Sequence, residues 1–156
     1  FSNAALQWVP DHPKLFKHIA SFLNPQGQLA VQMPCNFDHP SHKLAEDLAN
    51  TLFRNQMLEE TRKIPVLKPE EYAELLNSLG FQELKVRMYV YPHAMNSGMD
   101  VVEWVKGTLL TDYKKKMKPD DFEDFLKEYT RQLIKQIGAG SYLYCFKRIL
   151  LWGQLR

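Results

Sequence analysis

The sequence has 156 residues, 45% of them hydrophobic and 24% charged, which are values typical of a folded globular chain and exclude a disordered one. The formal net charge of +2 does not point to a polyanionic partner, and no apolar run of about 18 residues is present to cross a membrane. The two cysteines, Cys35 and Cys145, match no metal or redox spacing, so we expect buried, reduced thiols in a cytoplasmic protein.

The first residues are expected to be the end of a strand. Phe1-Ser2 runs directly into Asn3-Ala-Ala-Leu-Gln-Trp8, with no initiator Met and no helix cap. We therefore expect a chain cut from a longer protein, with an open sheet edge beside its first three residues.

A helix, a turn and a buried strand are predicted next. The helix runs from Pro13 to Leu23 with Asp11 or His12 as its cap, and its buried side carries Phe16 and Phe22. Leu29-Ala-Val-Gln-Met33 then has the composition of a parallel strand covered on both faces. Ligands of open α/β sheets bind beyond the carboxyl ends of such strands, so a site is expected after Met33.

Two more helices are predicted before the next strand. The first follows a loop over residues 34–40 and has Asp38 or Ser41 as its cap. Residues 59–65 are polar and expected to be irregular. The second helix opens at Pro69 with an acidic first turn and ends at Gly80.

The two remaining strands have different patterns. Phe81 to Tyr91 alternates apolar and polar residues, which predicts a half-exposed strand near an edge. Tyr142 to Trp152 is apolar on both faces apart from Lys147 and Arg148, which predicts an interior strand. The last strand should therefore lie between the central strand and the alternating one.

Two helices are expected between these strands. One starts at the capping-box-like Asp100-Val-Val-Glu103, and the other runs from Pro119 to Gly138. A long helical excursion between neighbouring strands predicts a lid over the strand ends. We assign residues 93–140 to this lid, as an insertion within one α/β domain that spans residues 1–156.

Few residues carry a recognisable chemical pattern. No phosphate-binding glycine loop is present, and the five histidines show no metal spacing, so no metal is expected. The basic run Lys114–Lys118 faces nearby acidic residues and indicates a solvated helix end rather than a nucleic-acid interface. Arg148 lies inside an apolar strand, where it is either half of a structural salt bridge or a clamp for an anion.

In combination, several motifs resemble the trans-aconitate 2-methyltransferases, which are class I S-adenosylmethionine-dependent methyltransferases. The motifs are Ser2-Asn-Ala-Ala-Leu-Gln-Trp8, Gly27-Gln-Leu-Ala-Val-Gln-Met-Pro34, Asn36, Ser41-His42, Val102-Glu-Trp-Val-Lys-Gly-Thr108 and Phe146-Lys-Arg148. The resemblance covers nearly the whole chain. It implies an α/β fold, namely the C-terminal part (strands four to seven) of a Rossmann-like sheet with an antiparallel last strand, together with a helical lid.

The resemblance also implies an activity. The expected reaction is O-methylation of a small polycarboxylic acid such as trans-aconitate, by direct displacement that forms a methyl ester. A carboxylate has a reference pKa near about 4 and is ionised at neutral pH, so no catalytic residue is expected to act as a base. The family's main loops for S-adenosyl-L-methionine lie on two earlier strands that are absent here, so we expect cofactor binding to depend on residues outside the chain.

The family pattern assigns roles to individual residues. Asn3, Ala4 and Trp8 are expected beside the methionyl end of the cofactor. The residues expected to line the substrate are Trp8, Asn36, His42, Tyr91, Trp104, Lys106 and Arg148.

A second hypothesis is a truncated, non-catalytic α/β module that dimerises or binds a partner through its exposed sheet edge. Neither hypothesis involves a nucleic acid or a membrane.

Overall fold

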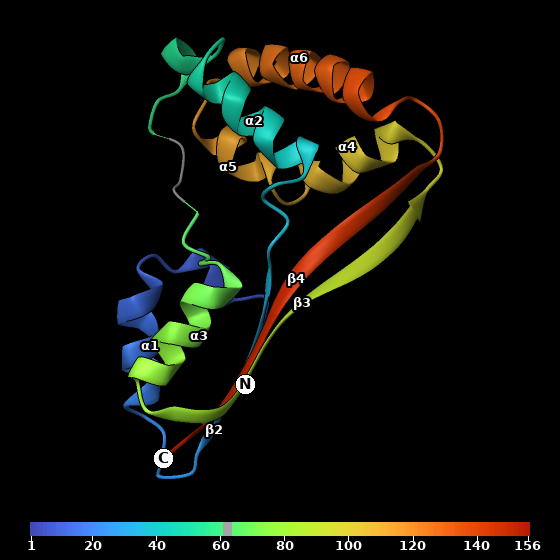
Figure 1. The fold of residues 1–156 in the computed structure, drawn as a ribbon. Coiled ribbons are helices and arrows are strands. Elements are labelled where there is room, and N and C mark those ends of the chain that lie inside the picture. Colours follow the sequence, from blue (N-terminus) through green and yellow to red (C-terminus); the bar gives the residue numbers. More distant parts are fainter. Residues whose placement is uncertain (61–63) are drawn as a thin grey trace. The chain divides into compact units, whose positions relative to one another are not determined.

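The computed structural model describes residues 1–60 and 64–156 (Figure 1). Residues 61–63, which belong to the stretch expected to be irregular, lie outside the described residues. The chain divides into two compact units. Unit 1 comprises Phe1–Cys35, Ile64–Tyr91 and Phe146–Arg156, and unit 2 comprises Asn36–Lys63 and Pro92–Cys145.

A four-stranded mixed sheet has the order β1-β2-β4-β3. Strand β1 (Ser2–Asn3) pairs in parallel with β2 (Gln28–Pro34), and β2 pairs antiparallel with β4 (Tyr142–Leu155). Strand β3 (Phe81–Met95) forms the other edge. The structure thus confirms that the last strand in sequence lies between the central strand and the alternating strand, which is at an edge.

In unit 1, helices α1 (His12–Ala20) and α3 (Pro69–Ser78) pack on the same face of the sheet (Figure 1). The rings of Phe16 from α1 and Tyr72 from α3 meet with centroids 5.4 Å apart. Phe22 was expected on the buried side but is 73% exposed, because α1 ends two residues earlier. The sheet supplies the rest of this core through Leu29, Val31, Met33, Phe81, Ile149 and Leu151.

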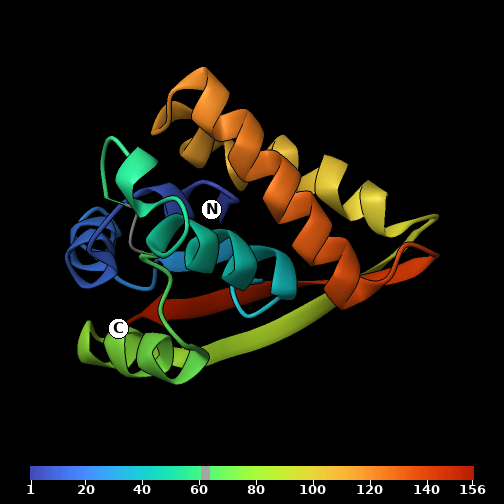
Figure 2. The ribbon, with the colours of Figure 1, turned by 90° about the horizontal axis from the view of Figure 1, so that it is seen from above.

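Unit 2 is mainly helical, and its longest helix, α6, packs against both α2 and α4 (Figures 1 and 2). Its α-helices are α2 (Pro40–Asn50), α4 (Gly98–Lys106), α5 (Leu110–Lys115) and α6 (Pro119–Ile137). Helix α6 ends at Gly138 as predicted, and there φ is 87°. None of the described helices in either unit has the length and apolar character needed to span a bilayer.

The sequence misplaced the starts of two helices in unit 2. The cap of α2 is His39, whose ring nitrogen accepts a hydrogen bond from the Ser41 backbone N–H (3.1 Å), rather than Asp38 or Ser41. The capping box of α4 joins Ser97 and Asp100, three residues before the expected one. An alanine at position 98 would place its Cβ 2.2 Å from the carbonyl oxygen of Gly138, so close packing requires glycine in the first turn of α4.

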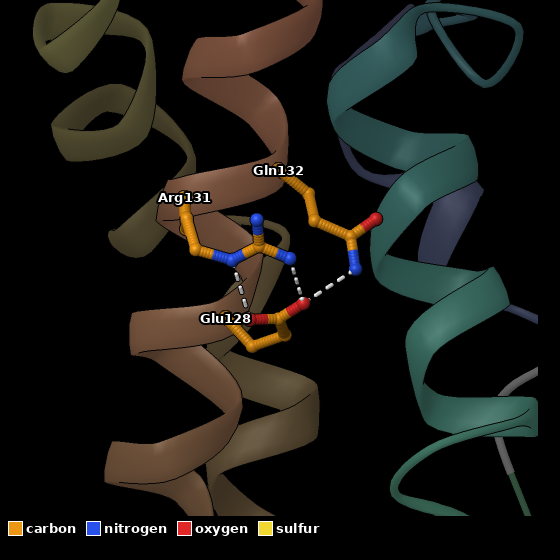
Figure 3. Close-up of polar contacts among 3 residues, drawn as sticks. All are labelled: Glu128, Arg131 and Gln132. Atoms are coloured by element: carbon orange, nitrogen blue, oxygen red, sulfur yellow. Dashed lines mark hydrogen bonds and ion pairs between the residues drawn. The ribbon is translucent and has the colours of Figure 1, made fainter.

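A compact polar group lies along α6 (Figure 3). The Glu128 carboxylate accepts hydrogen bonds from Arg131 Nε (2.8 Å), Arg131 Nη2 (2.6 Å) and Gln132 Nε2 (2.7 Å). The hydrogen bonds from Arg131 and then from Gln132 lower the pKa of Glu128 to about 2. All three residues belong to one helix, so this group supports α6 locally.

Candidate functional site

In unit 1, strand pairing brings polar residues to the sheet face opposite the core. Asn3 is the register partner of Gln32, and Pro34 is the partner of Arg148. Paired residues share a face, and side chains along a strand alternate between faces. The pairing therefore places Asn3, Gln32 and Arg148 on the same face, away from the buried side chains of β2.

The Gln32 amide joins two of the residues that the sequence singled out. Its Nε2 donates to Asn3 Oδ1 at 2.8 Å, and its Oε1 accepts from the Tyr91 hydroxyl at 3.3 Å. Asn3, Gln32, Tyr91 and Arg148 are called the sheet-face cluster below. Its members come from all four strands, β1, β2, β3 and β4.

Arg148 is held in this cluster by aromatic rings. Its Cζ lies 5.5 Å from the centroid of Tyr91 and 5.5 Å from that of Phe146, within the range of cation–π attraction. Within residues 1–60 and 64–156, no carboxylate lies within 4.0 Å of its guanidinium nitrogens. Of the two alternatives for Arg148, the structural salt bridge is thus not formed among these residues.

The end of β1 and the segment after it hold the three residues predicted to contact the cofactor. Ala4 has a φ of 51°, a left-handed conformation that costs a non-glycine residue roughly 1–2 kcal/mol. Two hydrogen bonds fix it: its N–H donates to the Gln32 carbonyl (2.8 Å), and its carbonyl accepts from Gln7 Nε2 (2.8 Å). The chain then forms the 3-10 helix η1 (Leu6–Trp8), which ends at Trp8 with 57% of that residue exposed.

In unit 2, a second polar group surrounds Tyr144. The Asn36 amide donates to the Tyr144 hydroxyl at 3.2 Å. The ring of His39 packs edge-on against the Tyr144 ring at 4.7 Å, and its Nε2 lies 3.0 Å from the Tyr142 hydroxyl. The Tyr144 network, as we call it, consists of Asn36, His39, Ser41, His42, Tyr129, Tyr142 and Tyr144.

Ser41 is the fully buried centre of the Tyr144 network. Its hydroxyl lies 2.8 Å from His39 Nδ1 and 3.1 Å from His42 Nδ1, and its carbonyl accepts from the Tyr129 hydroxyl at 3.0 Å. Burial, and then the neighbouring His39, lower the pKa of His42 to about 4. Burial raises the pKa of Tyr129 and of Tyr144. At neutral pH His42 is therefore uncharged, and both phenols keep their protons.

The two candidates on α4 lie in different surroundings. The ring of Trp104 meets His93 at 4.9 Å and Tyr144 at 6.0 Å, so Trp104 borders the Tyr144 network. Lys106 instead pairs with Glu103 at 2.8 Å, and both line a groove between α4 and α6. Unit 2 thus gathers Asn36, His42 and Trp104 around Tyr144, and it gives Lys106 a different partner.

Sequence reasoning missed several members of both groups. Gln32 could have been noticed as the one amide in the apolar run from Leu29 to Met33. His39 had a weaker signal, because it precedes a proline at the start of a helix. Tyr142 and Tyr144 were treated as ordinary residues of an apolar strand, and nothing local distinguishes them.

Comparison with known proteins places this fold in a class. Residues 1–86 match the family described as Methyltransferase domain. The chain belongs to this family, and its α/β sheet is the Rossmann-like sheet of class I S-adenosylmethionine-dependent methyltransferases. The solved structure of the YcgJ protein from Bacillus subtilis shares the fold, with a TM-score of 0.51 and 15% identity over 99% of this chain and 62% of that one.

Two curated relatives are more similar in sequence. Trans-aconitate 2-methyltransferase of Deinococcus radiodurans is 39% identical in an alignment that covers 96% of this chain and 60% of the relative. The protein of the same name from Escherichia coli O139:H28 is 34% identical in an alignment that covers 97% of this chain and 59% of that relative. The chain thus spans about 60% of the length of these relatives. The similarities do not favour the alternative of a non-catalytic module, whereas dimerisation through the sheet edge stays a prediction.

Proposed function

We propose that the complete protein is an S-adenosylmethionine-dependent O-methyltransferase that forms a methyl ester on a small polycarboxylic acid such as trans-aconitate. Family membership and the names of both relatives support the reaction class. The observation that carries the substrate class is Arg148, whose guanidinium lies over two aromatic rings and forms no ion pair within the described parts of the chain.

The geometry of Arg148 suits a carboxylate ligand. Stacking uses the faces of the guanidinium, whereas its N–H donors point outward in the guanidinium plane. A carboxylate can accept two of these donors side by side, which orients the acid as well as holding it. In our proposal Arg148 binds a carboxylate that is not methylated, and the carboxylate that reacts needs no base because it is already ionised at neutral pH.

The other predicted substrate contacts have supporting features of their own. Tyr91 provides one of the two rings under Arg148, and His42 is uncharged at neutral pH. The amides and aromatic rings in the predicted set can donate hydrogen bonds and exclude water without offering a competing carboxylate. The substrate contacts in the proposal are Trp8, Asn36, His42, Tyr91, Trp104, Lys106 and Arg148.

The residues after β1 fit the methionyl end of S-adenosyl-L-methionine. When bound, this cofactor supplies the methyl group that the acid receives. Gln32 Nε2 donates to Asn3 Oδ1, and within residues 1–60 and 64–156 the Nδ2 donors of Asn3 remain for a ligand. The left-handed turn at Ala4 and the exposed ring of Trp8 offer backbone and apolar contacts beside it.

The direct test is chemical. The complete protein is incubated with S-adenosyl-L-methionine and a panel of mono-, di- and tricarboxylic acids, and methyl esters are identified by mass spectrometry. We expect ester from acids with at least two carboxylates. Equal rates with monocarboxylic acids would contradict the proposed polycarboxylic substrate class. Absence of ester with every acid would contradict the proposed function.

Arg148→Met tests whether Arg148 binds a carboxylate of the acid. The substitution removes the charge and donors at similar length, so we expect the KM for the acid to rise about 30- to 100-fold, the loss of one or two hydrogen bonds to a charged group. The KM for S-adenosyl-L-methionine should change less than about twofold, because Arg148 is not among the proposed cofactor contacts. Arg54→Met, at an exposed arginine of η2 (Arg54–Gln56), is the matched control. An unchanged KM for the acid would remove Arg148 from the site.

A further inference from the structure

We propose that Gln32 is a positioning residue that sets the orientation of Arg148 through Tyr91. The inference rests on the proposed function, because it deepens the role of Arg148 as the carboxylate clamp. Gln32 is not among the residues that the family resemblance assigns to the site. It is instead singled out by the hydrogen bonds at both ends of its side-chain amide.

The link from Gln32 to Tyr91 passes over strand β4, which carries Arg148. Gln32 is on β2 and its register partner on β4 is Leu150, whereas Tyr91 is on β3, beyond β4. Strands in a sheet are about 4.8 Å apart, so the side chains of Gln32 and Tyr91 together span about 10 Å over β4. Arg148 is on that same face of β4, and its guanidinium lies over the Tyr91 ring. The Gln32–Tyr91 hydrogen bond thus anchors the ring on which Arg148 rests.

The hydrogen bond to Asn3 fixes the orientation of the Gln32 side-chain amide. Asn3 Oδ1 accepts from Gln32 Nε2, so Oε1 of Gln32 faces the other way and must receive a donor. The Tyr91 hydroxyl supplies that donor, which restrains the tilt of the ring. The backbone carbonyl of Gln32 also accepts from the Ala4 N–H at 2.8 Å. One residue therefore connects the segment proposed for the cofactor with the clamp proposed for the acid.

Loss of the Gln32–Tyr91 hydrogen bond should weaken binding of the acid more than any other property of the enzyme. Without the hydrogen bond the Tyr91 ring keeps its packing against Tyr89, with centroids 4.8 Å apart, but loses its polar anchor, so we expect the Arg148 guanidinium to sample more orientations. Binding then has to order the clamp, which weakens affinity for the acid. The expected size is that of one neutral hydrogen bond, a rise in the KM for the acid of about three- to tenfold.

The test is a double-mutant cycle in the complete protein. Gln32→Met keeps the length of the side chain without polar atoms, and Tyr91→Phe keeps the ring without the hydroxyl. We expect each single variant to raise the KM for the acid about three- to tenfold, and the double variant to match the worse single variant, because both remove the same bond. Tyr91→Phe should leave the KM for S-adenosyl-L-methionine within about twofold of wild type.

Gln28→Met is the matched control, because Gln28 is a glutamine on the same strand and face, four residues earlier. Its side chain bonds Trp152 Nε1 and takes no part in the sheet-face cluster, so the kinetics should stay at wild-type values. Two outcomes would overturn the inference. One is a double variant in which the increases in the acid KM from Gln32→Met and Tyr91→Phe multiply. The other is a Gln32→Met variant whose acid KM stays within twofold of wild type.

Urea unfolding of wild type, Gln32→Met, Tyr91→Phe and the double variant provides a measurement that needs no substrate. If the two side chains share one hydrogen bond, the double variant should be no less stable than Gln32→Met alone. Additive losses of unfolding free energy would overturn the link on their own. A wild-type protein that methylates no acid would defeat the proposed function, and this second cycle would still decide whether Gln32 anchors Tyr91.

Discussion

The sheet-face cluster of unit 1 and the Tyr144 network of unit 2 use their polar groups in different ways. In the sheet-face cluster, one amide joins two side chains, and Arg148 is held by ring faces. In the Tyr144 network, hydroxyl, amide and imidazole groups bond to one another, with Ser41 and Tyr144 fully buried. In the first arrangement Arg148 has no carboxylate partner among the described residues, whereas in the second the buried Ser41 and Tyr144 bond to neighbouring side chains of the network.

This difference tells us which property each group should control. A buried polar atom that loses its partner costs stability, because it cannot turn to water instead. A partly buried group that loses its partner can be solvated, so most of the loss appears in binding and only a small part in the free energy of unfolding. Substitutions at the buried Ser41 and Tyr144 should therefore change the free energy of unfolding, whereas substitutions in the sheet-face cluster should mainly change the KM for the acid.

The largest expected effect is the response of the Tyr144 network to pH. The pKa of His42 is about 4 in the folded protein and 6.5 in a free side chain, so the unfolded chain takes up the proton first. The stability that depends on uncharged His42 is complete above pH 6.5 and is lost as the pH falls toward 4. The loss should reach about 2–3 kcal/mol. Urea unfolding between pH 7 and pH 4 measures it.

Two variants isolate this effect. His42→Gln has no titrating ring, so its unfolding free energy should fall less than that of wild type over the same pH range. His18→Gln, at an exposed histidine of α1 in unit 1, should keep the wild-type dependence. If His42→Gln and wild type lose stability in parallel, His42 does not carry the pH response, and the Tyr144 network is less closed than we describe.

A matched pair of tyrosines gives the next largest effect and tests the comparison itself. Tyr144→Phe removes the buried phenol that accepts from the Asn36 amide, so we expect a loss of about 1–2 kcal/mol in unfolding free energy. Tyr91→Phe removes a hydroxyl that is only partly buried and should cost about 0.5 kcal/mol or less, while it raises the KM for the acid. Equal losses of stability in the two variants would contradict the distinction between the two groups.

The order of the strands could be predicted from sequence because burial on one or both faces is a local property. Phe81 to Tyr91 alternates, whereas Tyr142 to Trp152 is apolar on both faces, and the sheet has them at an edge and in the interior respectively. The helix starts were harder. Ser97 and Asp100 both begin plausible capping boxes, and the choice depends on packing of Gly98 against the distant carbonyl of Gly138.

The polar groups could not be assembled from sequence because their contacts are long-range. The hydrogen bond from Tyr91 to Gln32 joins residues 59 apart, and that from Asn36 to Tyr144 joins residues 108 apart. The family pattern supplied Tyr91 and Asn36 as separate candidates, but their partners have no local signature. Gln32 and Tyr144 acquire their roles only when β2, β3 and β4 are placed in register and the loop before α2 is closed.

The smallest expected effect lies on α6, where Glu128→Gln removes the charge that Arg131 and Gln132 bind (Figure 3). Arg131 is 63% exposed, so water and salt screen the pair, and we expect no resolvable change in urea midpoint at pH 7. The short hydrogen bonds of Glu128 at the surface should thus contribute less to the free energy of unfolding than the 3.2 Å bond between Asn36 and Tyr144. The buried groups have no water to replace a lost partner.

The pH dependence keeps this test separate from that of His42. The pKa of Glu128 is lowered from 4.5 to about 2, so whatever stability it contributes is present above pH 4.5 and lost as the pH falls toward 2. That range lies almost entirely below the one in which His42 titrates. A loss at pH 7 in Glu128→Gln as large as that in Tyr144→Phe would show that burial does not decide which hydrogen bonds stabilise unit 2.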